Sequence, residues 1–124
     1  MIGGAHTANH RWVICSALAR LNSFFPSSAL VDRIDTWLNE GVDLDPDGQY
    51  TEKSVGAYSP VCNEMFITMG RLMNRDDLLD VARKNLNMTL YYIQPGGEVL
   101  TNASGRQDSE NISDVTGYYY SYLY

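Results

Sequence analysis

The chain has 124 residues, with nine basic and fifteen acidic side chains and a formal net charge of -6 at pH 7. Hydrophobic residues make up 44% and charged residues 19%, which is the balance of a folded protein rather than of a disordered tail. No lysine or arginine cluster is present, so nucleic acid and membrane surfaces are not expected partners. The length leaves room for one domain, residues 1–124.

No secretory signal or membrane-spanning stretch is recognisable. The first residues lack a charged segment ahead of an apolar run, and no apolar stretch reaches membrane-spanning length. The two cysteines, Cys15 and Cys62, lie in apolar helical patterns, where cysteine usually behaves as a small buried residue. We expect both to be unpaired, and the compartment stays unknown.

A first pair of helices is predicted over residues 8–41. Apolar residues recur every three or four positions over residues 8–25, which is typical of an amphipathic helix with one buried face. That face is expected to hold Ile14, Ala17, Leu18, Leu21 and Phe25. Pro26 and two serines interrupt the pattern, and a second apolar stripe then ends at Gly41. Helices joined by so short a turn should lie antiparallel.

A second pair is predicted over residues 59–94, after a polar loop over residues 42–58. Ser59 is expected to cap the third helix, with Pro60 at its first position, and Asn74 to cap the fourth. Pro95 and two glycines stop that helix, and a second polar loop follows over residues 95–113. The aromatic segment 114–124 predicts the start of a further helix whose tyrosines nothing covers. We therefore expect the chain to be a fragment.

Paired helices separated by long loops favour an all-α fold. The expected architecture is a set of antiparallel helical hairpins in an incomplete α/α toroid, a solenoid-like arrangement with its long polar loops on one side. The uncovered tyrosine-rich end would offer a surface through which the chain forms an oligomer.

Three aspartates in the first loop suggest calcium as an alternative to the primary expectation of no cofactor. The first, third, fifth and sixth positions of a calcium-loop pattern are held by Asp43, Asp45, Asp47 and Gly48. The pattern then fails, because Ser54 stands at the twelfth position, where a bidentate carboxylate belongs. His6 and His10 have a spacing that suits two zinc ligands on a helix, but no third ligand is near.

Polar and aromatic residues gather at the head of the first helix and in the second half of the first loop. They are Asn9, His10 and Arg11, followed by Tyr50, Glu52, Ser54 and Tyr58. Brought together by the hairpins, they would form a groove that suits a sugar chain, because aromatic faces stack on sugar rings while polar groups bond the hydroxyls. In the alternative, structural interpretation, Asn9 caps the helix, Glu52 bonds its own loop and Tyr58 packs at an edge.

These residues, in this order, resemble the α/α-toroid portion of heparinase II/III-like polysaccharide lyases. That family carries an Asn-His pair at the start of a helix that runs on to a Phe-Pro, then a helix with a Trp. A loop of the form Asp-Gly-x-x-x-Glu-x-Ser follows, with a tyrosine close behind. The resemblance covers residues 8–79. Its counterparts here are Asn9, His10, Phe25, Pro26, Trp37, Asp47, Gly48, Glu52, Ser54 and Tyr58.

The resemblance implies β-elimination on a polysaccharide that contains uronic acid. A base removes the proton α to the carboxylate, an acid protonates the leaving glycosidic oxygen, and hydrogen bonds to the carboxylate stabilise the developing charge. By position, Asn9 would neutralise the carboxylate with help from His10, and Tyr58 would act as base or acid. A tyrosine base needs positive charge nearby, and Arg11 is its expected source. The substrate-binding residues are expected to be Arg11, Tyr50, Glu52 and Arg106.

The chain departs from the family pattern after Ser54. The family places its tyrosine three residues after the serine and follows it with histidine, whereas Tyr58 lies four residues after Ser54 and precedes Ser59. No histidine follows Tyr58 in this chain. Family members also contain further hairpins and a β-sandwich domain, so we expect a fragment or truncated member that is inactive as a short chain.

Two other functions stay open. A glycoside hydrolase on the α/α-toroid architecture would need two carboxylates that flank the scissile bond, and Glu52 could pair with Asp43 or Asp108. A non-catalytic helical-repeat module would instead bind carbohydrate or another partner through its loops and its tyrosine-rich end. Under the lyase interpretation the expected partner is an acidic polysaccharide or oligosaccharide.

Overall fold

The computed structural model describes residues 7–124, and its fold is mostly α-helical, as the sequence predicts. The helices are α1 (Ala8–Phe24), α2 (Ser28–Asn39), α3 (Tyr58–Met73), α4 (Asp76–Thr89) and α5 (Tyr119–Tyr122). Two 3-10 turns, η1 (Leu90–Tyr92) and η2 (Val115–Tyr118), adjoin α4 and α5. The strands β1 (Glu98–Val99) and β2 (Ser113–Asp114) pair antiparallel inside the region predicted to be loop, with Glu98 opposite Asp114.

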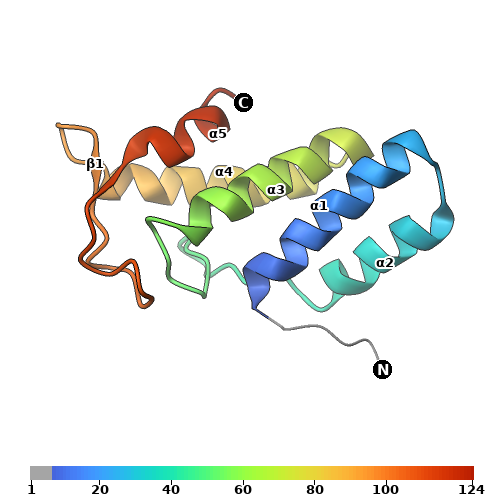
Figure 1. Cartoon of the computed structure of the whole chain (residues 1–124), viewed down its shortest axis with the longest axis horizontal. Helices are drawn as coiled ribbons and strands as arrows, with labels where there is room; N and C mark the ends of the chain where they lie inside the picture. The colour runs from blue at the N-terminus through green and yellow to red at the C-terminus, as the bar shows by residue number, and fades with distance from the viewer. Residues whose placement is uncertain (1–6) are drawn as a thin grey trace.

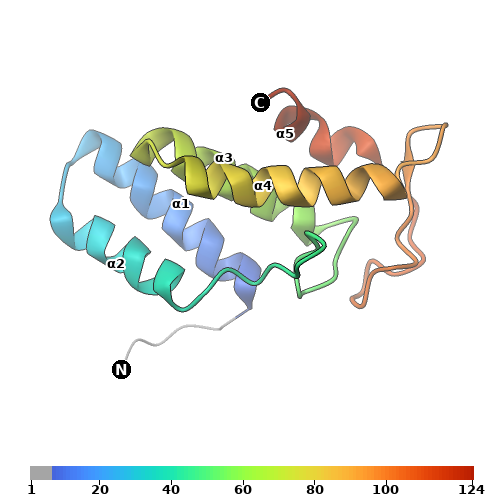
Figure 2. The ribbon, with the colours of Figure 1, turned by 180° about the vertical axis from the view of Figure 1, so that it is seen from behind.

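The helices form two hairpins, α1 with α2 and α3 with α4, that pack side by side (Figures 1 and 2). Helix α1 lies against α3, α2 covers the outer side of α1, and the short α5 rests on α3 and α4. The tight turns of both hairpins lie at one end, and both long connections emerge at the other (Figure 1). No helix within residues 7–124 is long and apolar enough to cross a membrane. The predicted pairing of His6 with His10 falls outside the described residues.

The buried face of α1 differs from the predicted one. Ile14 is 45% exposed, Leu21 46% and Phe25 70%, whereas Trp12, Cys15 and Ala19 are almost fully buried. The Trp12 ring packs on Phe66 of α3, with 4.9 Å between the ring centroids. Helices approach most closely where the facing side chains are small, so Cys15 and Ala19 let α1 approach α3. Of the predicted face, Leu18 packs against the core, whereas the face centred on Trp12, Cys15 and Ala19 was missed.

Two helix ends also differ from their predicted positions. Helix α3 begins at Tyr58, and Ser54 rather than Ser59 accepts its first free N–H groups. The Tyr58 amide donates to the Ser54 hydroxyl over 3.1 Å, and the Ser59 amide donates to the Ser54 carbonyl over 3.0 Å. Asn74, with φ 54°, ends α3 in the left-handed conformation instead of capping α4. Helix α4 begins instead with two aspartates, which stabilise a helix N-terminus.

The tyrosine-rich end is covered in part. Tyr118 is 1% exposed and packs with Val55, Leu86 and Val99 in a small second core. Its hydroxyl donates to the carbonyl of Val55, which ties the end of the chain to the first loop. The prediction that nothing covers this segment is therefore wrong for Tyr118. It holds for the exposed side chains Tyr119, Tyr120 and Leu123. Tyr122 donates to the Leu86 carbonyl over 2.9 Å, and Tyr124 lies against Arg71.

A buried chain of hydrogen bonds anchors the first loop to α3 and α4. The Tyr50 hydroxyl donates to Asn63 Oδ1 over 3.0 Å, and Asn63 Nδ2 donates to Asn85 Oδ1 over 2.8 Å. Asn85 Nδ2 then donates to the carbonyl of Gly48 over 2.9 Å. Gly48 has φ 95°, and a Cβ there would lie 2.5 Å from the Lys84 carbonyl oxygen. The loop can therefore return over α4 only with glycine at this position.

Replacing Asn85 by alanine should break the hydrogen bonds that anchor the first loop to α3 and α4, and so destabilise the whole protein. The change leaves Asn63 Nδ2 and the Gly48 carbonyl buried without partners, so we expect a loss of about 2–4 kcal/mol in the free energy of unfolding. Urea denaturation followed by circular dichroism measures it. Asn87→Ala on the exposed side of the same helix is the control and should stay within about 0.5 kcal/mol of the parent. Equal stabilities for both variants would contradict the anchoring role.

Cys15 and Cys62 should resist thiol reagents in the folded protein. Both are free and buried, and burial raises the pKa of each thiol to about 12. Since only the thiolate reacts, labelling with a disulfide reagent at pH 8 should proceed at the rate of unfolding. Two thiols per chain should react at once in guanidinium chloride. Fast labelling of either thiol without denaturant would contradict their burial.

Candidate functional site

Four of the predicted site residues come together where α1 and α3 begin. Arg106, from the loop between β1 and β2, donates from Nη1 to Glu52 Oε1 over 2.7 Å. The backbone amide of Asn9 donates to the other oxygen of Glu52 over 3.4 Å. The Arg106 guanidinium also lies over the Tyr58 ring, 5.2 Å from its centroid. Residues from α1, the first loop, α3 and the second loop therefore form one cluster, which we call the Glu52 cluster: Asn9, Glu52, Tyr58, Arg106 and Gln107.

Gln107 is the member of the cluster that the sequence did not predict. Its Nε2 donates to the Tyr58 hydroxyl oxygen over 2.9 Å. The phenol of Tyr58 thus has a hydrogen-bond donor at its oxygen and a guanidinium at its ring face. Its direct neighbour Arg106 was predicted, and adjacency in this polar loop was the signal by which Gln107 could have been found.

Backbone contacts between the two loops hold Arg106 and Gln107 in place. The Gly105 amide donates to the Lys53 carbonyl over 2.7 Å, and the Val55 amide donates to the Ser104 hydroxyl over 3.0 Å. Asp108 is buried, and its Oδ2 accepts from the Gly56 amide over 2.9 Å and from the Ser104 hydroxyl over 3.1 Å. Both flanks of the Arg106 turn are therefore fixed to the first loop.

Gly56 lies at the closest approach of the two loops. A Cβ on this residue would lie 3.0 Å from Thr101 Cγ2, 3.2 Å from Ser113 Oγ and 3.3 Å from Asp108 Oδ2. These distances are tighter than ordinary van der Waals contact, so a larger residue would push the loops apart. The absence of a side chain at position 56 lets Asp108 reach the backbone.

The amide side chain of Asn9 has no protein partner in the described part of the chain. Asn9 is buried, and its Oδ1 has no hydrogen-bond partner. His10, the next residue, is exposed, and its Nδ1 lies 2.8 Å from the Thr7 hydroxyl. The α1 N-terminus therefore offers an amide oxygen without a partner and, on the next residue, an exposed imidazole.

Arg11 does not supply positive charge to Tyr58, contrary to the sequence prediction. Its guanidinium donates to Glu40 over 3.0 Å and also to Asp43. It lies over the ring of Trp12, 5.0 Å from the centroid, and its side chain is 13% exposed. Arg11 therefore joins α1 to the end of α2 and to the first loop, and Arg106 is the cation that contacts Tyr58.

Tyr50 is a core residue rather than a surface group that can bind substrate. It is 3% exposed and stacks on Phe66 at a centroid distance of 6.3 Å. Burial raises the pKa of Tyr50 well above its usual value, with smaller contributions from Cys62 and Tyr118. Its hydroxyl is used in the bond to Asn63. The predicted role of Tyr50 in substrate binding is therefore wrong.

The three aspartates of the first loop do not converge on a metal position. Asp43 is paired with Arg11, and Asp45 makes backbone bonds with Gln49 and Gly48 in a tight turn. Across residues 7–124, no three His, Cys, Asp or Glu side chains come close enough together to hold a metal ion. The aspartates therefore shape the turn that brings Gly48 under α4.

The carboxylates proposed as partners of Glu52 in a hydrolase both have structural contacts. Asp43 binds Arg11, and Asp108 accepts from Gly56 and Ser104. Glu52 itself is 8% exposed at its side chain and is paired with Arg106. None of these contacts favours a pair of carboxylates that flank a sugar bond.

In comparisons with known proteins, the chain matches no family model, no curated protein and no solved structure. The Glu52 cluster is therefore interpreted from its own residues and geometry. It combines amides, a phenol and an ion pair at the end of the molecule from which both long loops emerge. The exposed His10 follows Asn9 in the sequence but contacts Thr7 instead of the cluster.

Replacing Asp108 by alanine should release the second loop from the first. The Gly56 amide then loses its acceptor, which costs about 1–3 kcal/mol, or roughly 10- to 100-fold in protection from hydrogen exchange. Amide exchange measured by NMR at Val55 and Gly56 tests this. Asp114→Ala removes an exposed carboxylate that accepts from the Thr116 amide at the start of η2 and makes no bond to the first loop, so it should leave both amides protected. Unchanged exchange at Gly56 in Asp108→Ala would contradict the docking of the two loops.

Proposed function

We propose that this chain is part of a polysaccharide lyase-like protein that acts by β-elimination on a polysaccharide containing uronic acid. The single observation that carries the proposal is the convergence of Asn9, Glu52, Tyr58 and Arg106, which come from three segments that lie far apart in the sequence. The ordered resemblance to heparinase II/III-like lyases selects Asn9 and Tyr58, and their proximity supports it. The two hairpins would be consecutive units of an α/α toroid, with the loops at the substrate face.

Asn9 and His10 would bind the uronic carboxylate. The Asn9 amide makes no side-chain hydrogen bond to any described residue, so its Nδ2 is available to donate to a ligand. Hydrogen bonds to the carboxylate strengthen as negative charge spreads onto it from the carbon that loses its proton. His10 is exposed beside Asn9 and could donate a second bond. The buried Oδ1 of Asn9, which has no partner among the described residues, would accept a hydrogen bond from a sugar hydroxyl rather than from the carboxylate.

Tyr58 would transfer the proton. Gln107 donates a hydrogen bond to the hydroxyl oxygen and the guanidinium of Arg106 lies over the ring, so the phenol is held in one orientation for proton transfer. In the elimination, the phenolate takes the proton α to the carboxylate, the new double bond forms, and the bond to the glycosidic oxygen breaks. The resulting phenol can return that proton to the departing oxygen, so a single residue closes the cycle without a later histidine.

Glu52 would orient the cluster rather than react. Its two oxygens accept from Arg106 and from the Asn9 amide, so it fixes the guanidinium over Tyr58 and the start of α1 at the same time. A side chain that is 8% exposed and paired in this way is poorly placed to contact substrate directly. We therefore assign Glu52 a positioning role and Tyr58 the catalytic one.

Replacing Tyr58 by phenylalanine should abolish lyase activity and preserve the fold. The assay follows the ultraviolet absorbance of the unsaturated product on alginate, heparan sulfate and related uronic-acid polymers, with the intact protein that contains this chain. Loss of the proton-transferring group should reduce the rate at least about 100-fold. Tyr91→Phe, at an exposed position on η1, is the matched control and should retain full activity. No product from any polymer, or an active Tyr58→Phe protein, would contradict the proposal.

A further inference from the structure

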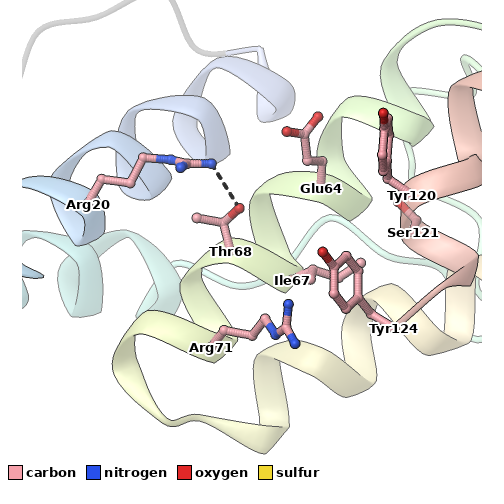
Figure 3. Close-up of a pocket in the computed structure, with 8 residues that line it drawn as sticks. All are labelled: Arg20, Glu64, Ile67, Thr68, Arg71, Tyr120, Ser121 and Tyr124. Atoms are coloured by element: carbon pink, nitrogen blue, oxygen red, sulfur yellow. Dashed lines mark hydrogen bonds between the residues drawn. The ribbon is translucent and has the colours of Figure 1, made fainter.

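A hollow lies on the molecule between α1, α3 and α5, separate from the Glu52 cluster (Figure 3). Its volume is about 330 Å³, which is within the range of roughly 300–1,000 Å³ for small-molecule sites. Thr68 and Arg71 on its wall follow Tyr58 by ten and thirteen residues on α3. At 1.5 Å per residue, they lie about 15–20 Å along the helix from the Glu52 cluster. The hollow is therefore a distinct surface feature.

Two arginines face this hollow without a carboxylate partner among the described residues. Arg20 donates to the Thr68 hydroxyl over 3.2 Å, and Arg71 lies over the Tyr124 ring, 4.0 Å from its centroid (Figure 3). In contrast, four other arginines of residues 7–124 are in ion pairs. They are Arg11, Arg75, Arg83 and Arg106. Arg33 also forms no ion pair, but it lies alone over the Trp37 ring, 4.0 Å from its centroid. In a chain with net charge -6, two arginines on one hollow that lack a carboxylate partner favour an anionic ligand.

The rest of the lining suits a ring that carries hydroxyl groups. Ile67 lines the hollow with an apolar surface, and the rings of Tyr120 and Tyr124 line the wall of the hollow that faces α5 (Figure 3). Glu64 lies beside Tyr120 at the rim and forms no ion pair with either arginine. A carboxylate at the rim accepts hydrogen bonds from hydroxyls and repels a ligand that carries negative charge over its whole surface. The lining therefore favours a sugar acid over an aromatic acid or a bare anion.

We propose that this hollow binds a single acidic sugar unit, a pyranose ring that bears one carboxylate. The carboxylate would bind Arg71, because the guanidinium fork matches the geometry of two carboxylate oxygens, and Arg20 would add positive charge from the opposite wall. One ring face would lie on Ile67 and the tyrosines, and the hydroxyls would bond Glu64 and Ser121. Stacking on Tyr124 orders Arg71 while leaving its N–H groups free of a carboxylate partner. The proposal does not depend on catalysis at Tyr58.

Titration of isotopically labelled protein with glucuronate, followed by amide chemical shifts, tests this site. We expect saturable shifts at Thr68, Arg71 and Ser121, and at least tenfold weaker binding of the neutral methyl glucoside. Arg71→Gln should weaken glucuronate binding about tenfold or more, and Arg20→Gln should act in the same direction. Lys84→Gln removes one positive charge on α4 outside the hollow and is the matched control, with affinity expected within twofold of the parent.

Two further arms separate this site from its alternatives. In Tyr58→Phe the shifts should persist unchanged, since they arise from a different surface from that of the proposed lyase reaction. Inorganic sulfate should bind more weakly than glucuronate, because it lacks the ring. The proposal is overturned if no saturable shifts occur, or if both arginine variants bind glucuronate as tightly as the parent does. It is also overturned if the shifts are lost in Tyr58→Phe, or if sulfate binds as tightly as glucuronate.

Discussion

The buried hydrogen bonds that run from Tyr50 through Asn63 and Asn85 to Gly48 are the constraint on which the rest of this structure depends. A loop of this length has no regular backbone pairing of its own beyond one bridge, so its path is fixed by what it bonds to. Each residue in this series forms a hydrogen bond with the next, so removing one of them would leave buried amide groups without a partner. The loop is therefore ordered as far as Ser54, which caps α3.

From this anchor, order extends to the second loop and then to the Glu52 cluster. The first loop presents the backbone of Lys53, Val55 and Gly56, and the second loop binds to it through Ser104 and Asp108. Glu52 and Arg106 belong to loops, and Asn9 and Tyr58 lie at helix N-termini. A buried network between α3 and α4 sets the position of the loops. Loops positioned by a rigid scaffold commonly carry function, and the interlock provides the precision that isolated loops lack.

Helical periodicity and short motifs predicted much of this arrangement, and burial of polar or small residues explains most of the misses. The hairpins followed from the spacing of apolar residues, and the meeting of Asn9, Glu52 and Tyr58 followed from loops leaving on one side. The face of α1 was missed because Cys15 and other small residues add little to an apolar count yet allow close helix packing. Tyr50 was misplaced because its polar hydroxyl suggested a surface role, whereas its partner in the core is 13 residues away in the sequence.

The distribution of arginines connects the two proposed sites. Arg11 and Arg106 each neutralise carboxylates, so they order the loops without adding net positive charge near Tyr58. With net charge -6, the chain repels a polyanion at long range, and this repulsion is screened beyond about 8–10 Å at physiological salt. Binding of an acidic polymer must then rely on short-range donors such as Asn9. The unpaired Arg20 and Arg71 are the positions at which a carboxylate gains most, because no protein carboxylate has to be displaced first.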